Sequence, residues 1–275
     1  MIYLALILLG LALGSFTNAV VWRLHQQSSV KSKKALQELS IAKGRSMCPD
    51  CRHTLSWFDL LPIISWLMVA GRCRYCKKRI SIQYPLVELL VAILLVTSWY
   101  AWPFLITNIY AALSFAFWCG CLMLLVALFL YDLKWMLLPN RLVYPLIVSA
   151  SGSTIFGAIA KGESFTHTVT SSVAGMLVLG GFFWLIYQVS RGKWIGGGDV
   201  RLGFALGLLL GGARSVVCLT AAAYLACIVI VILALLSKYH RNMKLPFGPF
   251  LITAAYGSLL WGQLVVDFYK RISGL

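Results

Sequence analysis

Seven apolar runs, each about as long as a membrane-crossing helix, restrict the folds open to this chain. A helix needs roughly 20 predominantly apolar residues to cross the hydrocarbon core of a bilayer. The runs occupy residues 2–22, 84–102, 104–131, 142–160, 168–190, 214–237 and 247–268, and a shorter glycine-rich segment lies at 202–213. We therefore predict an all-α polytopic membrane protein with about eight transmembrane helices.

The composition agrees with this fold class. Hydrophobic residues make up 60% of the chain and charged residues only 12%, with a mean hydropathy of +0.85, which is far from the balance of a soluble domain. The first run is too long and too interrupted by glycine for a cleaved signal sequence, and it lacks a small-residue cleavage site. We expect it to be retained as the first transmembrane helix.

The positive charge is concentrated in a few segments. Of the 24 lysines and arginines, 20 lie in residues 23–79, 132–141, 191–201 and 238–244. With eight helices these segments all fall on one side, which the positive-inside rule identifies as the cytosol, and both termini then lie outside the cytosol. Nucleic acid is not an expected partner despite the net charge of +16, because the first loop lacks interleaved aromatic and basic residues.

The first cytosolic loop carries two cysteine pairs, CPDC at 48–51 and CRYC at 73–76. Each pair offers two thiolates within one tight turn, and a separation of 21 residues is typical of a tetrahedral zinc site. Two disulfides are the alternative, but the cytosol is reducing. We predict that Cys48, Cys51, Cys73 and Cys76 bind zinc, and that a closed four-thiolate site is structural. The other four cysteines lie in apolar runs and are expected to pack there.

The sequence contains two isolated aspartates, which raise the question of catalysis. One lies in YDLKWMLLPN at 131–140 and the other in IGGGDVR at 195–201. An ionisable side chain near the membrane interior is costly and usually has a function. Asp132 and Asp199 are both expected at cytosolic helix ends, at similar depth. Either one alone fits a helix cap. Together they fit an aspartic protease pair, in which one carboxyl group keeps a proton while the other activates water.

The order of these motifs resembles the type IV prepilin peptidase family. The resemblance covers nearly the whole chain and rests on GSFTNAVVWRL at 14–24, the two CxxC pairs, RISIQYPLVELL at 79–90, YDLKWMLLPN, GGGD at 196–199 and PFGPFL at 246–251. GxGD alone is a weak signal, because presenilin-like proteases share it. The combination, in this order and with the cysteines, is specific.

The resemblance implies a function and a division of the chain. Asp132 and Asp199 would cut the basic leader of a prepilin or pseudopilin after a glycine at the cytosolic face of the bacterial inner membrane. The new amino terminus would then be methylated with S-adenosylmethionine. The expected domains are transmembrane helix 1 at 1–22, a zinc loop at 23–83 and a transmembrane aspartic peptidase domain at 84–275.

Several positions depart from the family pattern. Arg201 replaces the usual lysine after the GxGD aspartate and keeps the positive charge. Asn140 stands where the first motif usually ends in aspartate, and Arg52 and Lys77 replace glycines common after such cysteine pairs. The methyl-donor site is not identified, because no Rossmann fingerprint is present; Glu88, the lone acid of the second helix, is a candidate there or a packing residue.

Two alternative functions remain at this stage. The first is a peptidase without methyl transfer. The second is a non-enzymatic membrane protein whose aspartates relay protons or bind ions. Transporters often contain internal repeats, and the zinc loop has no counterpart in the second half of the chain.

Overall fold

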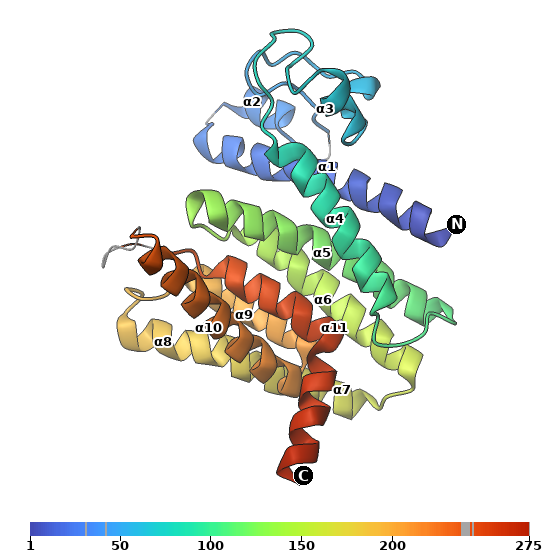
Figure 1. The fold of residues 1–275 in the computed structure, drawn as a ribbon, viewed down its shortest axis with the longest axis vertical. Coiled ribbons are helices and arrows are strands. Elements are labelled where there is room, and N and C mark those ends of the chain that lie inside the picture. Colours follow the sequence, from blue (N-terminus) through green and yellow to red (C-terminus); the bar gives the residue numbers. More distant parts are fainter. Residues whose placement is uncertain (31, 42, 238–242, 244, 275) are drawn as a thin grey trace. The chain divides into compact units, whose positions relative to one another are not determined.

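The computed structural model describes residues 1–275 except 31, 42, 238–242, 244 and 275. The chain divides into two compact units, unit 1 from Met1 to Tyr100 and unit 2 from Ala101 to Leu275. Their helices are drawn in Figure 1. Over the described residues the regular structure is helical, and extended pairing is confined to two isolated bridges. The all-α prediction is confirmed.

Within the described part of the chain, seven helices are long and apolar enough to cross a membrane. These helices are Ile2–Ser29, Gln83–Tyr100, Ile109–Trp135, Asn140–Lys161, Phe165–Ser190, Gly212–Leu235 and Gly248–Ser273. The shorter segment expected at 202–213 is also helical, as α9 at Gly197–Leu210. Its 14 residues are fewer than the roughly 20 that a full crossing takes. The chain is a polytopic membrane protein.

Unit 1 is built on a close packing of α1 (Ile2–Ser29) against α4 (Gln83–Tyr100). Gly10 and Gly14 lie on the contact face of α1, where a Cβ at Gly14 would be 2.6 Å from the Cα of Glu88. Gly10 meets the backbone of Ala92 in the same way. Small residues four apart let two transmembrane helices approach closely, so their van der Waals contact holds the pair together.

A lobe of turns and short helices joins α1 to α4. It contains α2 (Lys33–Glu38), η1 (Trp57–Leu60) and α3 (Ile64–Met68). The helix α1 continues seven residues beyond the end of its apolar run, which brings Arg23 into the base of the lobe. Arg23 is buried, and its guanidinium donates to the carbonyl oxygens of Ser40 at 2.8 Å and Gly44 at 2.9 Å. The Arg23 side chain thus holds the turn that follows α2.

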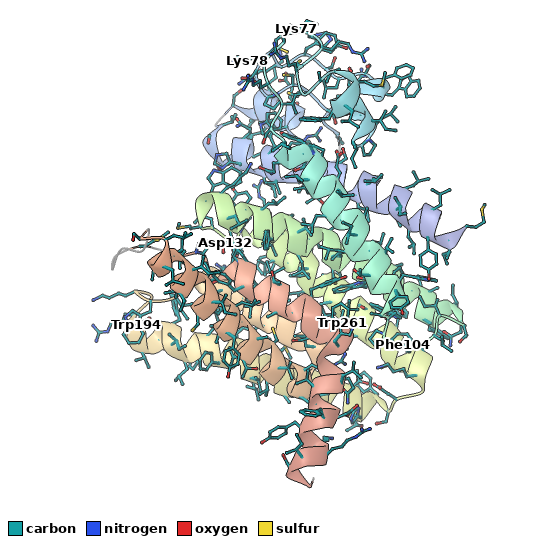
Figure 2. The ribbon with its side chains drawn as sticks, in the orientation of Figure 1. Lys77, Lys78, Phe104, Asp132, Trp194 and Trp261 are labelled. Atoms are coloured by element: carbon teal, nitrogen blue, oxygen red, sulfur yellow. The ribbon has the colours of Figure 1, made fainter. Side chains whose placement is uncertain are left out.

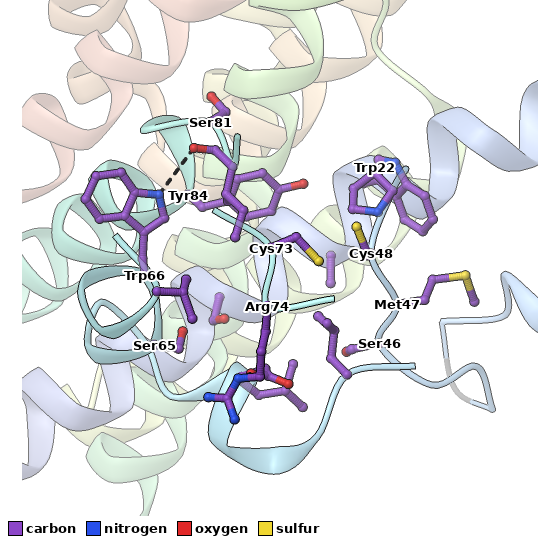
Figure 3. A pocket seen from close by; sticks show the side chains of 18 of the residues that line it. Trp22, Ser46, Met47, Cys48, Ser65, Trp66, Cys73, Arg74, Ser81 and Tyr84 are labelled. Atoms are coloured by element: carbon purple, nitrogen blue, oxygen red, sulfur yellow. Dashed lines mark hydrogen bonds and ion pairs between the residues drawn. The ribbon is translucent and has the colours of Figure 1, made fainter. Parts of the chain in front are cut away.

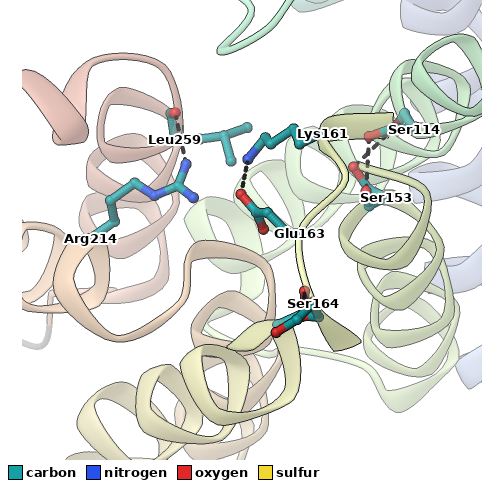
Figure 4. Close-up of polar contacts among 8 residues, drawn as sticks. Ser114, Ser153, Lys161, Glu163, Ser164, Arg214 and Leu259 are labelled. Carbon is teal, nitrogen blue, oxygen red and sulfur yellow. Dashed lines mark hydrogen bonds and ion pairs between the residues drawn. The ribbon is translucent and has the colours of Figure 1, made fainter. Parts of the chain in front are cut away.

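Unit 2 is a bundle of the remaining helices. It begins with α5 (Ile109–Trp135) and α6 (Asn140–Lys161), which are joined by a reciprocal pair of hydrogen bonds: the Ser114 hydroxyl donates to the Ser153 carbonyl at 2.8 Å and the Ser153 hydroxyl to the Ser114 carbonyl at 3.1 Å (Figure 4). The next span consists of α7 (Phe165–Met176), the π-helical turn η2 (Leu177–Gly181) and α8 (Phe182–Ser190). The chain ends with α10 (Gly212–Leu235) and α11 (Gly248–Ser273).

The short helix α9 lies in the core of unit 2. Its side chains Leu202, Leu206 and Leu210 are almost completely buried, and it contacts α6, α7 and η2. The backbones of α9 and α7 meet at Gly207 and Gly175, where neither position has room for a Cβ. Because a buried helix is held by neighbours on several sides, the residues at its first turn are placed firmly.

One end of unit 2 gathers several helix ends. The last turn of α5 and the segment that follows α8 lie there, as the labelled residues Asp132 and Trp194 show, whereas Phe104 and Trp261 lie further along the bundle (Figure 2). Most of the basic segment 238–244 falls outside the described residues. At its far end, unit 2 carries an ion pair of Lys161 with Glu163 at 3.2 Å (Figure 4).

Candidate functional site

Asp132 lies in the last turn of α5 and is only 5% exposed. The backbone N–H of Gly248, the first residue of α11, donates to its Oδ2 at 3.0 Å. A helix N-terminus offers free N–H groups and a partial positive charge, so it is a favourable neighbour for a carboxylate. A Cβ at position 248 would lie 2.5 Å from the same oxygen, which means that the contact requires glycine.

Asp199 lies in the first turn of α9, directly after the glycine run. None of Gly196, Gly197 and Gly198 has a positive φ. Unusual dihedral angles are therefore not the reason for glycine here. Gly198 instead meets the side chain of Leu138, whose Cβ would be 2.9 Å from an added Cβ. The glycine allows the loop after α5 to approach the first turn of α9.

The helices α5, α9 and α11 thus bring the two predicted aspartates to one end of unit 2. The loop after α5 reaches the first turn of α9 through the contact of Leu138 with Gly198. Among the described residues, neither takes part in an ion pair. Arg201, the nearby positive charge, donates its Nε to the carbonyl of Gly197 at 3.0 Å and so holds the glycine run. Asn140 is the first residue of α6, whose N-cap position is occupied by Pro139.

The four predicted metal ligands lie together in the lobe of unit 1. All four Sγ atoms are within 4.8 Å of one another, and Cys48 Sγ and Cys76 Sγ are 3.9 Å apart. Four thiolates about 2.3 Å from a zinc ion at tetrahedral angles are roughly 3.8 Å from each other. The cysteine cluster therefore has the size that a tetrahedral metal site requires. Cys48 and Cys73 are buried, and Cys51 is exposed.

The two cysteine pairs form equivalent turns. In each, the first cysteine's N–H donates to the carbonyl five residues on: Cys48 to His53 at 3.0 Å and Cys73 to Lys78 at 2.8 Å. The positions where glycine is common have φ of +54° at Arg52 and +60° at Lys77. Both non-glycine residues thus adopt the left-handed conformation that glycine takes at no cost. The substitution leaves the turn intact.

Polar contacts fix the lobe around the cysteines. Burial opposes ionisation of Cys73, but the backbone N–H groups of Cys76 and Tyr75 outweigh it and lower the pKa of this thiol to about 7. Asp59 is paired with Arg74 at 3.2 Å. Burial opposes its charge, yet hydrogen bonds from Ser56 and the Arg74 charge hold the pKa of Asp59 below its usual value. Burial has the opposite result at the neighbouring Cys48, where it raises the pKa of the thiol to about 12.

A cavity of about 350 Å³ lies between the lobe and the ends of α1 and α4 that join it, entirely within unit 1 (Figure 3). Its wall includes the buried carboxylate of Glu88, whose Oε2 accepts the N–H of Ile63 at 2.7 Å. Ile63 has φ +60° and ψ −52°, and its neighbours Pro62 and Ile64 close a three-residue turn. This turn is strained for a β-branched residue, and its N–H is the group that binds the Glu88 carboxylate.

Comparisons with known proteins match both units. Residues 8–102 match the bacterial peptidase A24 N-terminal domain, and residues 119–235 match the type IV leader peptidase family. The first range contains the four cysteines and Glu88, and the second contains both aspartates.

Curated relatives match along almost the full length. The chain is 32% identical to a protein of Aeromonas salmonicida, 33% to one of Aeromonas hydrophila and 31% to one of Pseudomonas aeruginosa, each called prepilin leader peptidase/N-methyltransferase. Each comparison covers 98% of this chain and 94% of the relative. No solved structure matches significantly. With both domain matches in order and relatives of this identity over the whole length, the chain belongs to the type IV leader peptidase family.

Proposed function

We propose that this protein is a membrane-embedded aspartic endopeptidase that removes the basic leader of a prepilin or pseudopilin and N-methylates the new amino terminus. The convergence of Asp132 and Asp199 at one end of unit 2 is the observation that carries the peptidase assignment. The names of the relatives support both the substrate class and the second activity.

In the proposed reaction the two aspartates share one proton, because two carboxylates held close together do not both ionise easily. The ionised group takes a proton from a water molecule, which attacks the scissile carbonyl. The protonated group hydrogen-bonds to that carbonyl oxygen, and the departing amine receives a proton as the C–N bond breaks. The Gly248 N–H orients Asp132 throughout.

The proposed orientation places this end of unit 2 in the cytosol of a bacterial cell, with the protein in the inner membrane. Both termini lie outside the cytosol in this orientation, which counts the short helix α9 as an eighth crossing. The basic residues of 132–141 and 191–201 are next to the two aspartates in sequence, and the positive-inside rule supports a cytosolic location. A leader with positive charges would remain on this same side, so the aspartates and the bond to be cut would be at one membrane face.

The proposed cofactors have separate roles. The residues Cys48, Cys51, Cys73 and Cys76 would hold a structural zinc ion, because four thiolates leave no open position for a reacting water molecule. S-adenosylmethionine would be the methyl donor. A zinc domain at 23–83 and a transmembrane peptidase domain at 84–275 remain our proposed functional division.

The test is cleavage of a synthetic leader-bearing helix by the purified protein in detergent. Asp132→Asn and Asp199→Asn should each lower the cleavage rate by about 1,000-fold or more, because asparagine keeps the size of the side chain but does not exchange the proton. The double variant should lose little beyond either single one, because cooperating catalytic residues are not additive. Undiminished cleavage by correctly inserted Asp199→Asn protein would refute the assignment. A cut product without an added methyl group would limit the function to peptidase.

A further inference from the structure

The lobe of unit 1 has an apolar outer surface over η1 and α3, which contact each other. Neither of these short helices has a buried residue, although both are rich in large apolar side chains. An extended apolar surface on a folded protein marks a site of contact with a membrane or with a partner. Six side chains, each between 41% and 69% exposed, form what we call the apolar patch: Trp57, Phe58, Leu60, Ile64, Leu67 and Met68.

The other face of both helices is turned toward the interior of the lobe. In η1, the Asp59 side chain is 8% exposed and accepts hydrogen bonds from the N–H and the hydroxyl of Ser56. In α3, Ser65 and Trp66 line the cavity (Figure 3), and the Trp66 indole donates to the Ile80 carbonyl at 3.3 Å. A helix on a soluble protein turns its apolar stripe inward instead. The patch therefore has the orientation expected of a segment with apolar surroundings.

The position of α3 beside the membrane-spanning helices places the patch at membrane depth. The Ile63 N–H, just before α3, binds the Glu88 carboxylate at 2.7 Å, and Glu88 packs against Gly14 of α1. Gly14 lies eight residues before the end of the apolar run 2–22, and Glu88 lies four residues after the start of the run 84–102. Figure 1 accordingly shows α3 beside α1 and not beyond its end.

These positions correspond to the depth of an interfacial helix. At about 1.5 Å per residue, the contact of Gly14 with Glu88 lies about 6–12 Å inside the ends of the two apolar runs. Amphipathic helices that lie in a membrane surface bury their apolar face by about 5–10 Å. The turn at Ile63 is fixed to Glu88, so α3 and its exposed side chains lie near the same depth.

The charges of the lobe flank the patch. Between Arg52 and Arg72 the sequence contains no lysine or arginine, and its one acidic residue is Asp59, which is turned inward and paired with Arg74 at 3.2 Å. Arg52 and Arg72 are both exposed. Tryptophan and other amphipathic or apolar side chains next to basic ones are typical of membrane interfaces, where the basic groups attract anionic lipid headgroups.

We propose that the apolar patch is a membrane anchor, whose side chains insert into the lipid leaflet on the lobe side of the membrane. The acyl chains match the patch, and the lipid phosphates match the arginines beside it. The anchor holds the lobe, with its cysteine cluster and the turn at Ile63, in the membrane surface instead of in bulk solvent. This inference rests on the polytopic fold and on the position of α3, and it is independent of the proposed catalysis.

The first experiment identifies what covers the patch. A photoreactive phenylalanine analogue replaces Phe58 or Leu67 in the full-length protein, which is reconstituted into vesicles of phosphatidylethanolamine and phosphatidylglycerol. After illumination, mass spectrometry should find phospholipid adducts at both positions. The same analogue at Lys77, an exposed position of the lobe outside the patch, is the control and should give little or no lipid adduct.

The other possible occupants give different products in this experiment. Adducts with peptides of residues 101–275, with a second copy of the chain or with solvent alone would overturn the anchor. Equal yields of lipid adduct at Lys77 and Leu67 would also overturn it, because the contact would not be specific to the patch. Asp199→Asn protein should give the same lipid adducts as the unmodified protein, so the result does not depend on leader cleavage.

The second experiment measures whether the membrane protects the segment. Amide hydrogen exchange of residues 57–69 is followed in the same vesicles. Leu67→Asp should speed this exchange by about tenfold or more, because a charged side chain at this depth favours release of the segment from the bilayer. Gln37→Asp, at an exposed polar position of α2 in the same lobe, is the matched control and should leave the exchange unchanged.

The same measurement shows whether the lobe of the Leu67→Asp protein is still folded. The N–H groups of Cys48 and Cys73 are hydrogen-bonded within the two cysteine turns, so their protection reports on the lobe apart from the patch. Faster exchange at 57–69 with unchanged protection of these two amides would support the anchor. Unchanged exchange at 57–69 in a protein that keeps both turns would overturn it, because a segment that faces water tolerates the aspartate.

Discussion

Gly248 occupies a position where any side chain would collide with a predicted catalytic group. Its N–H donates to Asp132 at 3.0 Å, and an added Cβ would lie 2.5 Å from the accepting oxygen. The side chain of Asp132 is surrounded by packed helices, so it has little room to move away. A methyl group added at position 248 should therefore displace the Asp132 carboxylate more than it disturbs the helix α11.

We expect Gly248→Ala to lower leader cleavage by about 100-fold, because a displacement of about 1 Å at a reacting group has an effect of this size. Gly257→Ala is the control in the same helix, where an added Cβ meets no atom within 4 Å. That variant should cleave normally. Initial rates on the leader-bearing peptide decide between them, and equal rates in both variants would contradict the role given to Gly248.

Arg23 and Arg201 show a second feature at the scale of single residues. Both are arginines that the sequence places near a polar boundary, and both bind backbone carbonyls, Arg23 at Ser40 and Gly44 and Arg201 at Gly197. A rigid fork of N–H donors suits this use better than a lysine ammonium does. The positive charge of the two arginines predicted that they lie on the cytosolic side of the membrane. The hydrogen bonds of both arginines, however, depend on turns that form only when the chain folds.

At the scale of helices, unit 1 depends on the approach of α1 to α4. Gly10 and Gly14 leave no space for side chains at this crossing. Inside a bilayer the lipid tails are as apolar as the helices, so close packing is the main source of their association.

Gly10→Ile should therefore separate the two helices and lower the free energy of unfolding of unit 1 by about 1–3 kcal/mol, as overpacking does in other cores. Ala12→Ile, at an exposed position on α1, adds a similar volume without a packed neighbour. Thermal unfolding in detergent should show a lower melting temperature for the first variant alone. A common shift in both would indicate that the crossing does not hold unit 1.

At the scale of the whole molecule, the two compact units coincide closely with the two family matches, residues 8–102 and 119–235. The metal cluster and the Glu88 cavity belong to the first unit, and both predicted catalytic aspartates belong to the second. Cys48 and Cys73 are also part of the cavity wall. Because the metal cluster and the two aspartates belong to different units, loss of the metal should disturb the lobe more than leader cleavage.

Changing Cys48 and Cys51 together to serine should release the metal, because serine hydroxyls do not replace thiolate ligands. The lobe should then loosen, so methyl transfer or protein yield should fall while leader cleavage persists at least in part. Metal content by atomic emission, together with the mass of the cleaved peptide, measures all three effects. Complete loss of cleavage in a well-folded variant would show that the metal also supports the peptidase. Cys227→Ser, an exposed cysteine outside the cluster, is the control.

The sequence alone determined the features that depend on local composition and spacing. Apolar runs of bilayer length predicted the seven long helices and the shorter one, and the spacing of Cys48, Cys51, Cys73 and Cys76 predicted a metal cluster. Asp132 and Asp199 were singled out because an isolated charge in an apolar segment is costly. The two roles remain predictions until the variants are measured.

Only the tertiary structure decided which distant residues meet. Nothing in the pattern around PFGPFL indicates that the Gly248 N–H binds Asp132, 116 residues away. Glu88 was ambiguous in sequence, and only the fold of the lobe places it in a cavity beside Trp66, with the strained turn at Ile63 as its donor. Whether a segment forms a helix depends on residues that lie near one another in the sequence. Contacts between elements depend on packing and helix crossings, which are set by the whole chain at once.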